Sequence, residues 1–218
     1  MRAVIFDLDG TLLNRDATLR AFCNAQCEKF QLPLTTDKFV ERMATLDDNG
    51  YVRKEIVYAQ IAAENEFSKE LELLLFEDYM NHFQDFSVPF EGLHETLGEL
   101  KQQQFRLGLI TNGRHAGQQA SIEALGIEAY FDVILISESA GLAKPDAAIF
   151  EHALMSLNVM AHESCYVGDH PINDIEAARN VGLMTIWKRN QQYIDGIADE
   201  VIDTLPEIIT IVRGRIQT

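Results

Sequence analysis

The segment AVIFDLDGTLLN, residues 3–14, runs four apolar residues directly into two carboxylates, Asp7 and Asp9. An apolar run of this length that stops at acidic and glycine residues is typical of a buried β-strand. Residues two apart in extended backbone point to the same side, so Asp7 and Asp9 should project together from the carboxyl end of the strand. Two such carboxylates repel each other unless a cation lies beside them. The segment is therefore either an acidic turn or part of a cation site.

A calcium-binding loop of the form DxDxxG is one interpretation of these two carboxylates. An EF-hand loop would need glycine where Leu12 stands and glutamate where Thr18 stands. It would also follow a helix rather than an apolar strand. We therefore set the EF-hand aside.

The composition indicates a globular protein with a strongly acidic surface. The chain has 218 residues, 47% of them hydrophobic, which is enough for one domain with an insert or for two small domains. A formal net charge of −16 would repel nucleic acid phosphates and anionic lipids. We expect neither nucleic acid nor membrane partners, and a small anionic substrate would need a bound cation or a few basic groups at its site.

The sequence shows no sign of secretion or of a structural metal. No apolar run reaches the length of about eighteen residues needed for a membrane span, and MRAVIFDL meets an acid too early for a signal peptide. We therefore expect a cytoplasmic protein. Cys23, Cys27 and Cys165 form no disulfide framework, and core packing is their expected role. The six histidines have no metal-binding spacing.

Apolar, strand-like runs alternate with helical segments over most of the chain. The runs lie at residues 3–6, 106–110, 132–137, 165–168 and 184–187. Helical segments between and after them lie at residues 92–104, 115–126, 146–157 and 173–182. This alternation predicts an α/β fold with a doubly wound parallel sheet, whose ligands bind beyond the carboxyl ends of the strands.

A helical stretch interrupts this alternation directly after the first strand. Apolar residues recur at helical spacing between residues 14 and 86, and the sequence DDNG at residues 47–50 separates a second helix from a third. We expect residues 1–13 and 88–218 to form the α/β core. Residues 14–87 should form an inserted helical bundle.

Three further polar motifs follow other parts of the predicted sheet. LITNG contains Thr111 and Asn112, GLAKPDAAIF contains Lys144, and VGDHPIND contains Asp169 and Asp174. Taken singly, these motifs are most simply a turn, a solvated lysine and an acidic turn. A hydroxyl and free backbone N–H groups at a strand terminus also suit a phosphate oxygen.

The doubly wound topology allows these motifs to converge on one crevice, because the first strand has a neighbour on either side. Several carboxylates around one point require a hard cation, most plausibly Mg²⁺ with oxygen ligands. A metal ion, a lysine and a hydroxyl would then make an anion site within an acidic protein. Asp7 and Asp9 are best explained as a metal-bound nucleophile and its proton-transfer partner.

The motifs DLDGT, TNG, the Lys-Pro pair of GLAKPDAAIF, and GDHPIND, in this order, resemble those of the haloacid dehalogenase-like hydrolase superfamily. The helical-cap subfamily of phosphatases fits best, since the helical insert follows the first motif. The resemblance covers residues 1–13 and about 88–218, whereas the insert matches by position and helicity. It implies a Rossmann-like core with an inserted helical cap.

The resemblance implies catalytic roles for residues of the first three motifs. Asp7 would attack phosphorus and form an aspartyl phosphate, while Asp9 would protonate the leaving group and later activate water. Thr111, Asn112 and Lys144 would hold the transferring phosphoryl group and stabilise its charge.

The resemblance also implies a Mg²⁺ site. Asp7, the backbone carbonyl of Asp9, and Asp169 would bind the ion directly. Asp174 would orient a metal-bound water or Lys144. Asn14 stands where many relatives carry an acid, which affects the expected hinge and leaves the reaction unchanged.

The leading functional hypothesis is a Mg²⁺-dependent phosphatase that acts on a small phosphorylated metabolite. A phosphoglucomutase-like phosphotransferase shares every core motif. A 2-haloacid dehalogenase is disfavoured by the intact DLD motif, since its carbon chemistry neither needs Mg²⁺ nor gains from Asp9 as an acid. A phospho-accepting signalling module is disfavoured by motif order, because its acceptor follows the third strand, and a single stable phosphorylation in place of repeated turnover would identify one.

The sequence identifies neither the substrate nor the oligomeric state. Phosphoglycolate, sugar phosphates and nucleoside monophosphates all remain open, as do a monomer and a dimer. Arg42, Asn49, Arg53 and Lys54 of the insert are candidate substrate contacts. Arg53 follows the predicted loop DDNGYV and is the first to test, although a solvated charge is the simpler interpretation.

Overall fold

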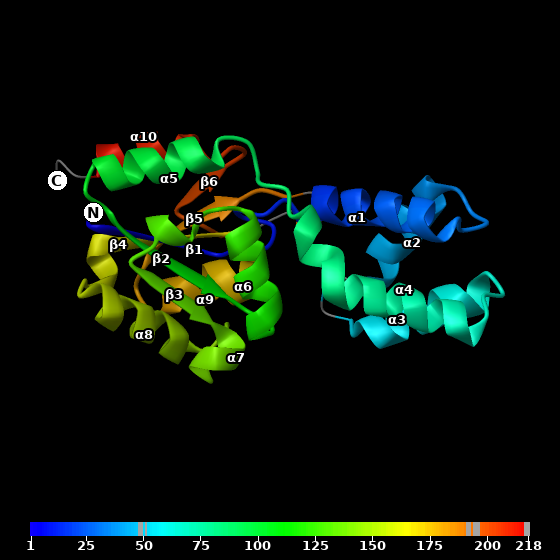
Figure 1. The fold of residues 1–218 in the computed structure, drawn as a ribbon. Coiled ribbons are helices and arrows are strands. Elements are labelled where there is room, and N and C mark those ends of the chain that lie inside the picture. The colour runs from blue at the N-terminus through cyan, green and yellow to red at the C-terminus, as the bar shows by residue number, and fades with distance from the viewer. Residues whose placement is uncertain (48–49, 51, 191–192, 194–196, 216–218) are drawn as a thin grey trace. The chain divides into compact units, whose positions relative to one another are not determined.

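The computed structural model describes residues 1–47, 50, 52–190, 193 and 197–215. The chain divides into two compact units (Figure 1). One unit consists of residues 1–14 and 89–218, and the other of residues 15–88.

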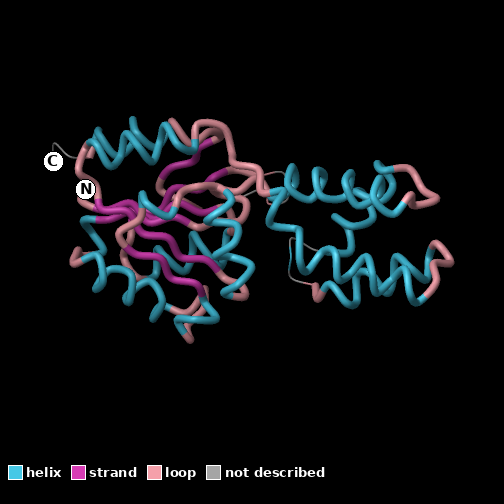
Figure 2. The backbone as a smooth tube through the Cα atoms, in the orientation of Figure 1, coloured by secondary structure: helices cyan, strands magenta, loops and turns pink. Residues whose placement is uncertain are grey.

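The first unit is an α/β unit built on a six-stranded parallel sheet (Figure 2). The strand order is β3-β2-β1-β4-β5-β6. The bounds are β1 (Ala3–Phe6), β2 (Arg106–Thr111), β3 (Val133–Ile136), β4 (Ser164–Gly168), β5 (Met184–Lys188) and β6 (Glu200–Ile202). The predicted fold class is confirmed, since β1 lies between β2 and β4 and the carboxyl ends of these strands meet at one edge.

The sixth strand was absent from the sequence-based prediction. β6 has three residues, Glu200, Val201 and Ile202, and only Ile202 among them is buried. A short edge strand of this kind needs no long apolar run, so periodicity gives little signal for it. Its position is fixed by pairing with β5, in which Trp187 lies opposite Val201.

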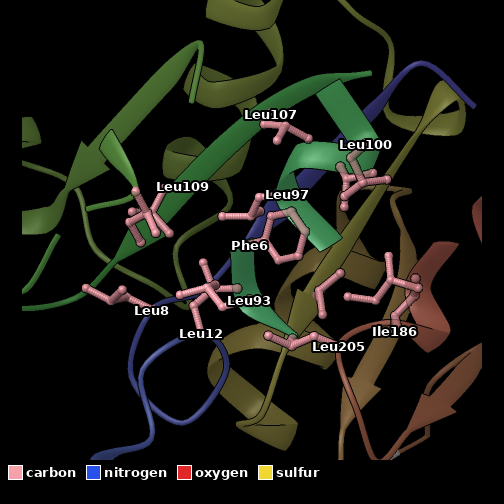
Figure 3. Close-up of a cluster of buried hydrophobic side chains, with 14 of the residues drawn as sticks. Phe6, Leu8, Leu12, Leu93, Leu97, Leu100, Leu107, Leu109, Ile186 and Leu205 are labelled. Atoms are coloured by element: carbon pink, nitrogen blue, oxygen red, sulfur yellow. The ribbon is translucent and has the colours of Figure 1, made fainter. Parts of the chain in front are cut away.

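Helices cover both faces of the sheet. Alternation along β1 places Val4 and Phe6 in one hydrophobic core and Ala3 and Ile5 in another. The core around Phe6 also contains apolar side chains of α5 (Leu93–Gln102), α6 (His115–Ala124) and α10 (Glu207–Gly214). Figure 3 shows Leu93, Leu97 and Leu100 of α5 in this core. The core around Ile5 contains those of α8 (Ala147–Leu157) and α9 (Ala177–Asn180).

The remaining elements of the α/β unit connect the strands. They are α5 (Leu93–Gln102), α6 (His115–Ala124), η3 (Glu128–Tyr130), α7 (Ser137–Ala140), α8 (Ala147–Leu157), η4 (Ala161–Glu163), η5 (Pro171–Glu176), α9 (Ala177–Asn180) and α10 (Glu207–Gly214). Asp146 caps α8, because its side chain accepts from the Ala148 N–H at 3.0 Å.

The helix expected at residues 173–182 has a different form in the structure. A π-helical turn, η5, precedes the short α9. His170 begins this turn, since its Nδ1 accepts from the N–H groups of Ile172 at 3.2 Å and Asn173 at 3.1 Å. A π-helical turn is a feature often found at functional sites, and it carries Asp174.

The described residues of the second unit form helices joined by loops. It consists of α1 (Arg15–Phe30), α2 (Thr36–Asp47), α3 (Lys54–Glu64), α4 (Lys69–His82) and η2 (Phe83–Phe86). Aromatic rings dominate its core, and Phe22 contacts Tyr79, Phe83 and Phe86 with ring centroids 5.4 to 5.6 Å apart. Asp48, Asn49 and Tyr51, from the predicted loop, lie outside the described residues.

The cysteines pack as expected, and all three are buried free thiols. Cys23 and Cys27 lie in the core of the helical unit, and Cys165 lies in the core around Phe6. Across the part of the chain that the structure describes, we find no helix both long and apolar enough to cross a bilayer.

Candidate active site

The first acidic residue of the site follows directly on β1. The Asp7 N–H donates to the Val167 carbonyl at 2.9 Å, which extends the pairing of β1 with β4. Leu8, Leu12 and Leu13 are buried in the core beyond the strand end. The N–H groups of Leu12 and Leu13 both donate to the Leu8 carbonyl at 2.9 Å. These anchors fix the turn and hold Asp7 at the carboxyl edge of the sheet.

Lys144 lies between two carboxylates. Its Nζ donates to Asp7 Oδ1 and Asp174 Oδ1, both at 2.6 Å, and to the Tyr166 hydroxyl oxygen at 3.0 Å. Asp7, Lys144 and Asp174 are only 5%, 6% and 1% exposed. Burial lowers the pKa of Lys144, but Asp174 and Asp7 raise it by more, so the pKa stands well above its ordinary value. The ammonium group therefore stays charged.

Backbone contacts fix both ends of this bridge. The Asn112 side chain donates to the Lys144 carbonyl at 2.8 Å and accepts from the Lys144 N–H at 2.9 Å. Asp174 Oδ2 accepts from the N–H groups of Asp169 at 3.2 Å and His170 at 3.0 Å. Asn112 thus positions the lysine backbone, and Asp174 connects Lys144 to the end of β4.

Three buried carboxylates form a compact group at this edge of the sheet. Oxygen atoms of Asp7, Asp169 and Asp174 all lie within 4.8 Å of one another. Burial raises the pKa of Asp7 to about 7 even though Lys144 lowers it. Burial and the charges of Asp7 and Asp174 raise the pKa of Asp169 to about 8. These raised pKa values indicate that the protein's own groups neutralise only part of the negative charge of the carboxylates.

A divalent cation fits this group of acids. When all are ionised, three carboxylates and the Lys144 ammonium carry a net charge of −2, which a dication neutralises. The donor set consists of oxygen atoms, which hard cations such as Mg²⁺ prefer. The structure therefore contains a candidate metal site at the end of β1 and β4.

Asp169 is held from two directions. Its Oδ2 accepts from Asn190 Nδ2 at 2.9 Å, and its carbonyl accepts from Trp187 Nε1 at 2.9 Å. On the other side, Gly10 has a φ of +82°, and a Cβ built on it would lie 2.1 Å from Asp169 Oδ2. Glycine is therefore required in the DLDGT motif to admit the Asp169 carboxylate.

The second acid of the motif has a different environment. Asp9 Oδ2 accepts from Gln118 Nε2 at 2.8 Å, and the same nitrogen donates to Thr111 Oγ1 at 2.5 Å. The Thr11 hydroxyl donates to Asp7 Oδ2 at 3.2 Å. Asp9 and Thr111 are thus connected through one amide, and the Asp9 side chain is not part of the three-carboxylate group.

The structure brings the predicted core residues to one edge of the sheet through two sets of contacts. The first set joins Asp7, Lys144, Asp174, Asp169 and Asn112, and the second joins Asp9 and Thr111. Sequence reasoning missed several partners of these residues, among them Gln118, Tyr166, Trp187 and Asn190. None has a motif of its own, although Gln118 follows TNG closely and Tyr166 lies in a predicted strand.

The candidate contacts of the helical unit form ion pairs within that unit. Arg53 is 72% exposed and pairs with Glu55 at 3.3 Å. Arg42 pairs with Glu64 at 2.5 Å, and Lys54 forms an ion pair with the buried Asp47. Asn49 lies outside the described residues.

A protein-family model and several individual proteins match this chain. The family model of the haloacid dehalogenase-like hydrolases matches residues 4–188. The glyceraldehyde 3-phosphate phosphatase of Pyrococcus furiosus is 34% identical over 128 residues, which cover 56% of this chain and 53% of that protein. The match thus spans about half the length of this curated relative.

Two further matches extend over nearly the whole chain. The glyceraldehyde 3-phosphate phosphatase of Methanothermobacter thermautotrophicus is 29% identical over 230 residues, covering 95% of this chain and 98% of that protein. The hydrolase YfnB of Bacillus subtilis, solved bound to magnesium, has a TM-score of 0.78 at 23% identity and covers 97% of this chain and 98% of its own. This structural likeness shows a shared fold.

Proposed function

The chain belongs to the haloacid dehalogenase-like hydrolase family, and we propose that it is a Mg²⁺-dependent phosphatase of small phosphomonoesters. The observation that carries the proposal is the position of Lys144, which touches both Asp7 and Asp174 beside the three-carboxylate group. A buried cation hydrogen-bonded to a carboxylate suits an enzyme that attacks an anionic ester.

The first chemical step transfers the phosphoryl group to Asp7. A carboxylate oxygen of Asp7 forms a bond to phosphorus, while the bond from phosphorus to the leaving oxygen breaks. Asp9 gives its proton to that oxygen, and the alcohol leaves. The Lys144 ammonium and the Thr111 hydroxyl donate hydrogen bonds to the transferring group and stabilise its charge.

The second step returns Asp7 to its starting state. A water molecule gives a proton to the Asp9 carboxylate and attacks phosphorus, and the bond to the Asp7 oxygen breaks. Inorganic phosphate leaves, the Asp7 carboxylate is restored, and Asp9 is protonated for the next cycle. Asn112 acts through Lys144 by holding its backbone in place.

The cation belongs at the three-carboxylate group. Asp7, the Asp9 carbonyl and Asp169 would hold Mg²⁺, and Asp174, whose oxygens are engaged by Lys144 and two backbone N–H groups, would orient the lysine. When bound, the ion supplies positive charge that allows a carboxylate and a phosphate ester to approach each other.

We assign substrate selection to the helical unit, residues 15–88, as a cap. Every residue with a proposed chemical role lies in the α/β unit, so the helical unit is free to vary with the substrate. Two relatives are named for glyceraldehyde 3-phosphate, and this ester belongs first in a substrate screen, followed by phosphoglycolate, sugar phosphates and nucleoside monophosphates.

The test is turnover of these esters by the purified protein. We expect repeated release of inorganic phosphate, loss of activity in EDTA and recovery with Mg²⁺. Asp7→Asn should abolish turnover with the fold retained, because an amide is a poor nucleophile. Full activity of Asp7→Asn would refute the covalent mechanism. Transfer of phosphate to a sugar phosphate instead of water would identify a phosphotransferase.

A further inference from the structure

Gln118 makes two contacts that link the second acid of the site to the phosphoryl-binding hydroxyl. Its Nε2 donates to Asp9 Oδ2 at 2.8 Å and to Thr111 Oγ1 at 2.5 Å. The residue lies on the first turns of α6, and its backbone N–H donates to the Arg114 carbonyl at 3.1 Å. The side chain therefore reaches both groups from a regular helix.

The turn before α6 is shaped to admit this side chain. A Cβ built on Gly113 would lie 2.9 Å from Gln118 Cγ and 3.0 Å from its Cδ. The same turn is tied to the end of β3, since the Gly113 N–H donates to Ser137 Oγ at 2.9 Å and the His115 N–H donates to Glu138 Oε2 at 2.7 Å. The glycine of TNG thus makes room for Gln118, and these two hydrogen bonds hold the turn that precedes it.

The two hydrogen bonds constrain how both acceptors are used. A primary amide nitrogen carries two hydrogens, and here they point to one oxygen each of Asp9 and Thr111. The hydrogen bond to Asp9 Oδ2 fixes the orientation of the whole carboxyl group, because its two oxygens lie in one plane. Because Thr111 Oγ1 accepts from the amide, its own hydrogen is directed elsewhere, and the phosphoryl group is the acceptor that the proposed reaction supplies.

We propose that Gln118 is a positioning residue that orients Asp9 for proton transfer to the leaving oxygen and Thr111 for donation to the phosphoryl group. The inference rests on the proposed phosphatase function. It assigns no substrate contact to Gln118, which acts through the two residues that it holds. Preorganisation of this kind lowers the barrier only for the steps that use the held groups.

Because Gln118 is proposed to act through Asp9, its role can be measured by comparing substrates whose leaving groups differ in their need for an acid. An alkyl phosphate needs its leaving oxygen protonated, whereas 2,4-dinitrophenyl phosphate releases a stable anion and gains little from an acid. The value of kcat/KM reports events up to the first irreversible step, which is transfer to Asp7. Loss of Asp9 orientation should therefore lower kcat/KM for the alkyl ester much more than for the aryl ester.

The variants are Gln118→Met, which keeps the length and removes the donor, and Gln118→Glu, which replaces the donor with a repelling carboxylate. Gln119→Met is the matched control, since Gln119 is the next residue of α6 and its amide donates to Glu123 at 2.9 Å and Glu128 at 3.2 Å. Each is compared with wild type on the best alkyl phosphate from the screen and on 2,4-dinitrophenyl phosphate. Thermal unfolding establishes that each variant is folded.

We expect both Gln118 variants to lose at least roughly tenfold more kcat/KM on the alkyl ester than on the aryl ester, and the control to resemble wild type. Equal losses on the two esters would overturn the positioning of Asp9, and wild-type values for Gln118→Met would overturn the positioning role as a whole, while wild-type turnover still supports a phosphatase. A wild-type protein that turns over neither ester would refute the proposed function and this inference with it. If Gln118→Met fails to fold, the ratio measured with Gln118→Glu decides.

Discussion

Replacing Gly10 by alanine should damage the proposed metal site through a single methyl group. A Cβ at this position would lie 2.1 Å from Asp169 Oδ2 and 2.6 Å from its Cγ. Since carbon and oxygen atoms that are not bonded approach to about 3.3 Å, the Asp169 carboxylate must move by roughly 1 Å. Such a movement breaks its alignment with Asp7 and strains the hydrogen bond from Asn190.

A second glycine separates this effect from ordinary backbone strain. Gly10 and Gly126 have φ values of +82° and +65°, and no atom lies within 4 Å of a Cβ built on Gly126. Alanine in the left-handed region costs about 1–2 kcal/mol at either position, which lowers Tm by roughly 2–8 °C in a chain of this size. Only Gly10→Ala should also raise the Mg²⁺ concentration for half-maximal activity, by roughly tenfold to a hundredfold.

The assay combines thermal unfolding, direct calorimetric titration with Mg²⁺, and turnover as a function of Mg²⁺ concentration. Wild-type affinity for Mg²⁺ in Gly10→Ala would mean that Asp169 does not bind the ion. An equal loss of affinity in Gly126→Ala would trace the effect to general strain. Either result refutes the reasoning from the close approach of Gly10 to Asp169.

Four further outcomes follow from the structure. Ca²⁺ in place of Mg²⁺ should inhibit turnover, since its longer bonds and larger coordination number disturb the line of attack, and equal rates with both ions would contradict this. Burial raises the pKa of Asp199, but hydrogen bonds from the Thr185 N–H at 2.8 Å and hydroxyl at 2.9 Å lower it by more, to below its ordinary value. This depressed pKa contributes stability above about pH 3.9 that disappears as the pH falls through the folded-state value, so Asp199→Ala should destabilise the protein at pH 7 and progressively less in acid-unfolding measurements at lower pH. Gln26→Leu should cost about 1–3 kcal/mol in chemical denaturation, because the buried Tyr58 hydroxyl loses the acceptor that it contacts at 2.8 Å, and wild-type stability would show that water replaces it. Arg53→Ala should leave stability within about 0.5 kcal/mol of wild type and kinetics on both esters unchanged, whereas a selective loss on the natural metabolite would make this exposed arginine a substrate contact.

The sequence was sufficient to predict the central strands of the sheet because these strands are buried on both faces. β1 reads as an uninterrupted apolar run, β4 reads as one after Ser164, and in each the acidic residues follow where the strand ends. Once parallel order is assumed, Asp7 and Asp169 must lie near each other, since the carboxyl ends of adjacent strands meet. The contact of Lys144 with Asp7 spans 137 residues, and only the ordered set of motifs made it predictable from sequence.

The partners that sequence reasoning missed depend on side-chain direction in three dimensions. Gln118 and Asp9 are 109 residues apart, and nothing in the pattern HAGQQAS distinguishes Gln118 from Gln119, which points to surface carboxylates. Tyr166 is a residue type common in β-strands and stands in no polar motif, yet its hydroxyl contacts Lys144. Periodicity identifies the buried face of an element, but it does not say which atom a buried polar side chain will meet.

The burial of three neighbouring carboxylates favours a functional over a stabilising role for the polar motifs. A core that gathers Asp7, Asp169 and Asp174 departs from the rule that acids stay exposed, and burial raises the pKa of Asp7 and Asp169 to about 7 and about 8. Apolar residues of similar size would stabilise this edge of the sheet better than acids that repel one another. The apolar pattern of a buried strand is kept along β1 and is broken by buried acids at its carboxyl end, and such local exceptions are typical of functional sites. One lysine and several backbone N–H groups partly compensate for the burial of these acids. Glycine leaves the space that one of the carboxylates occupies.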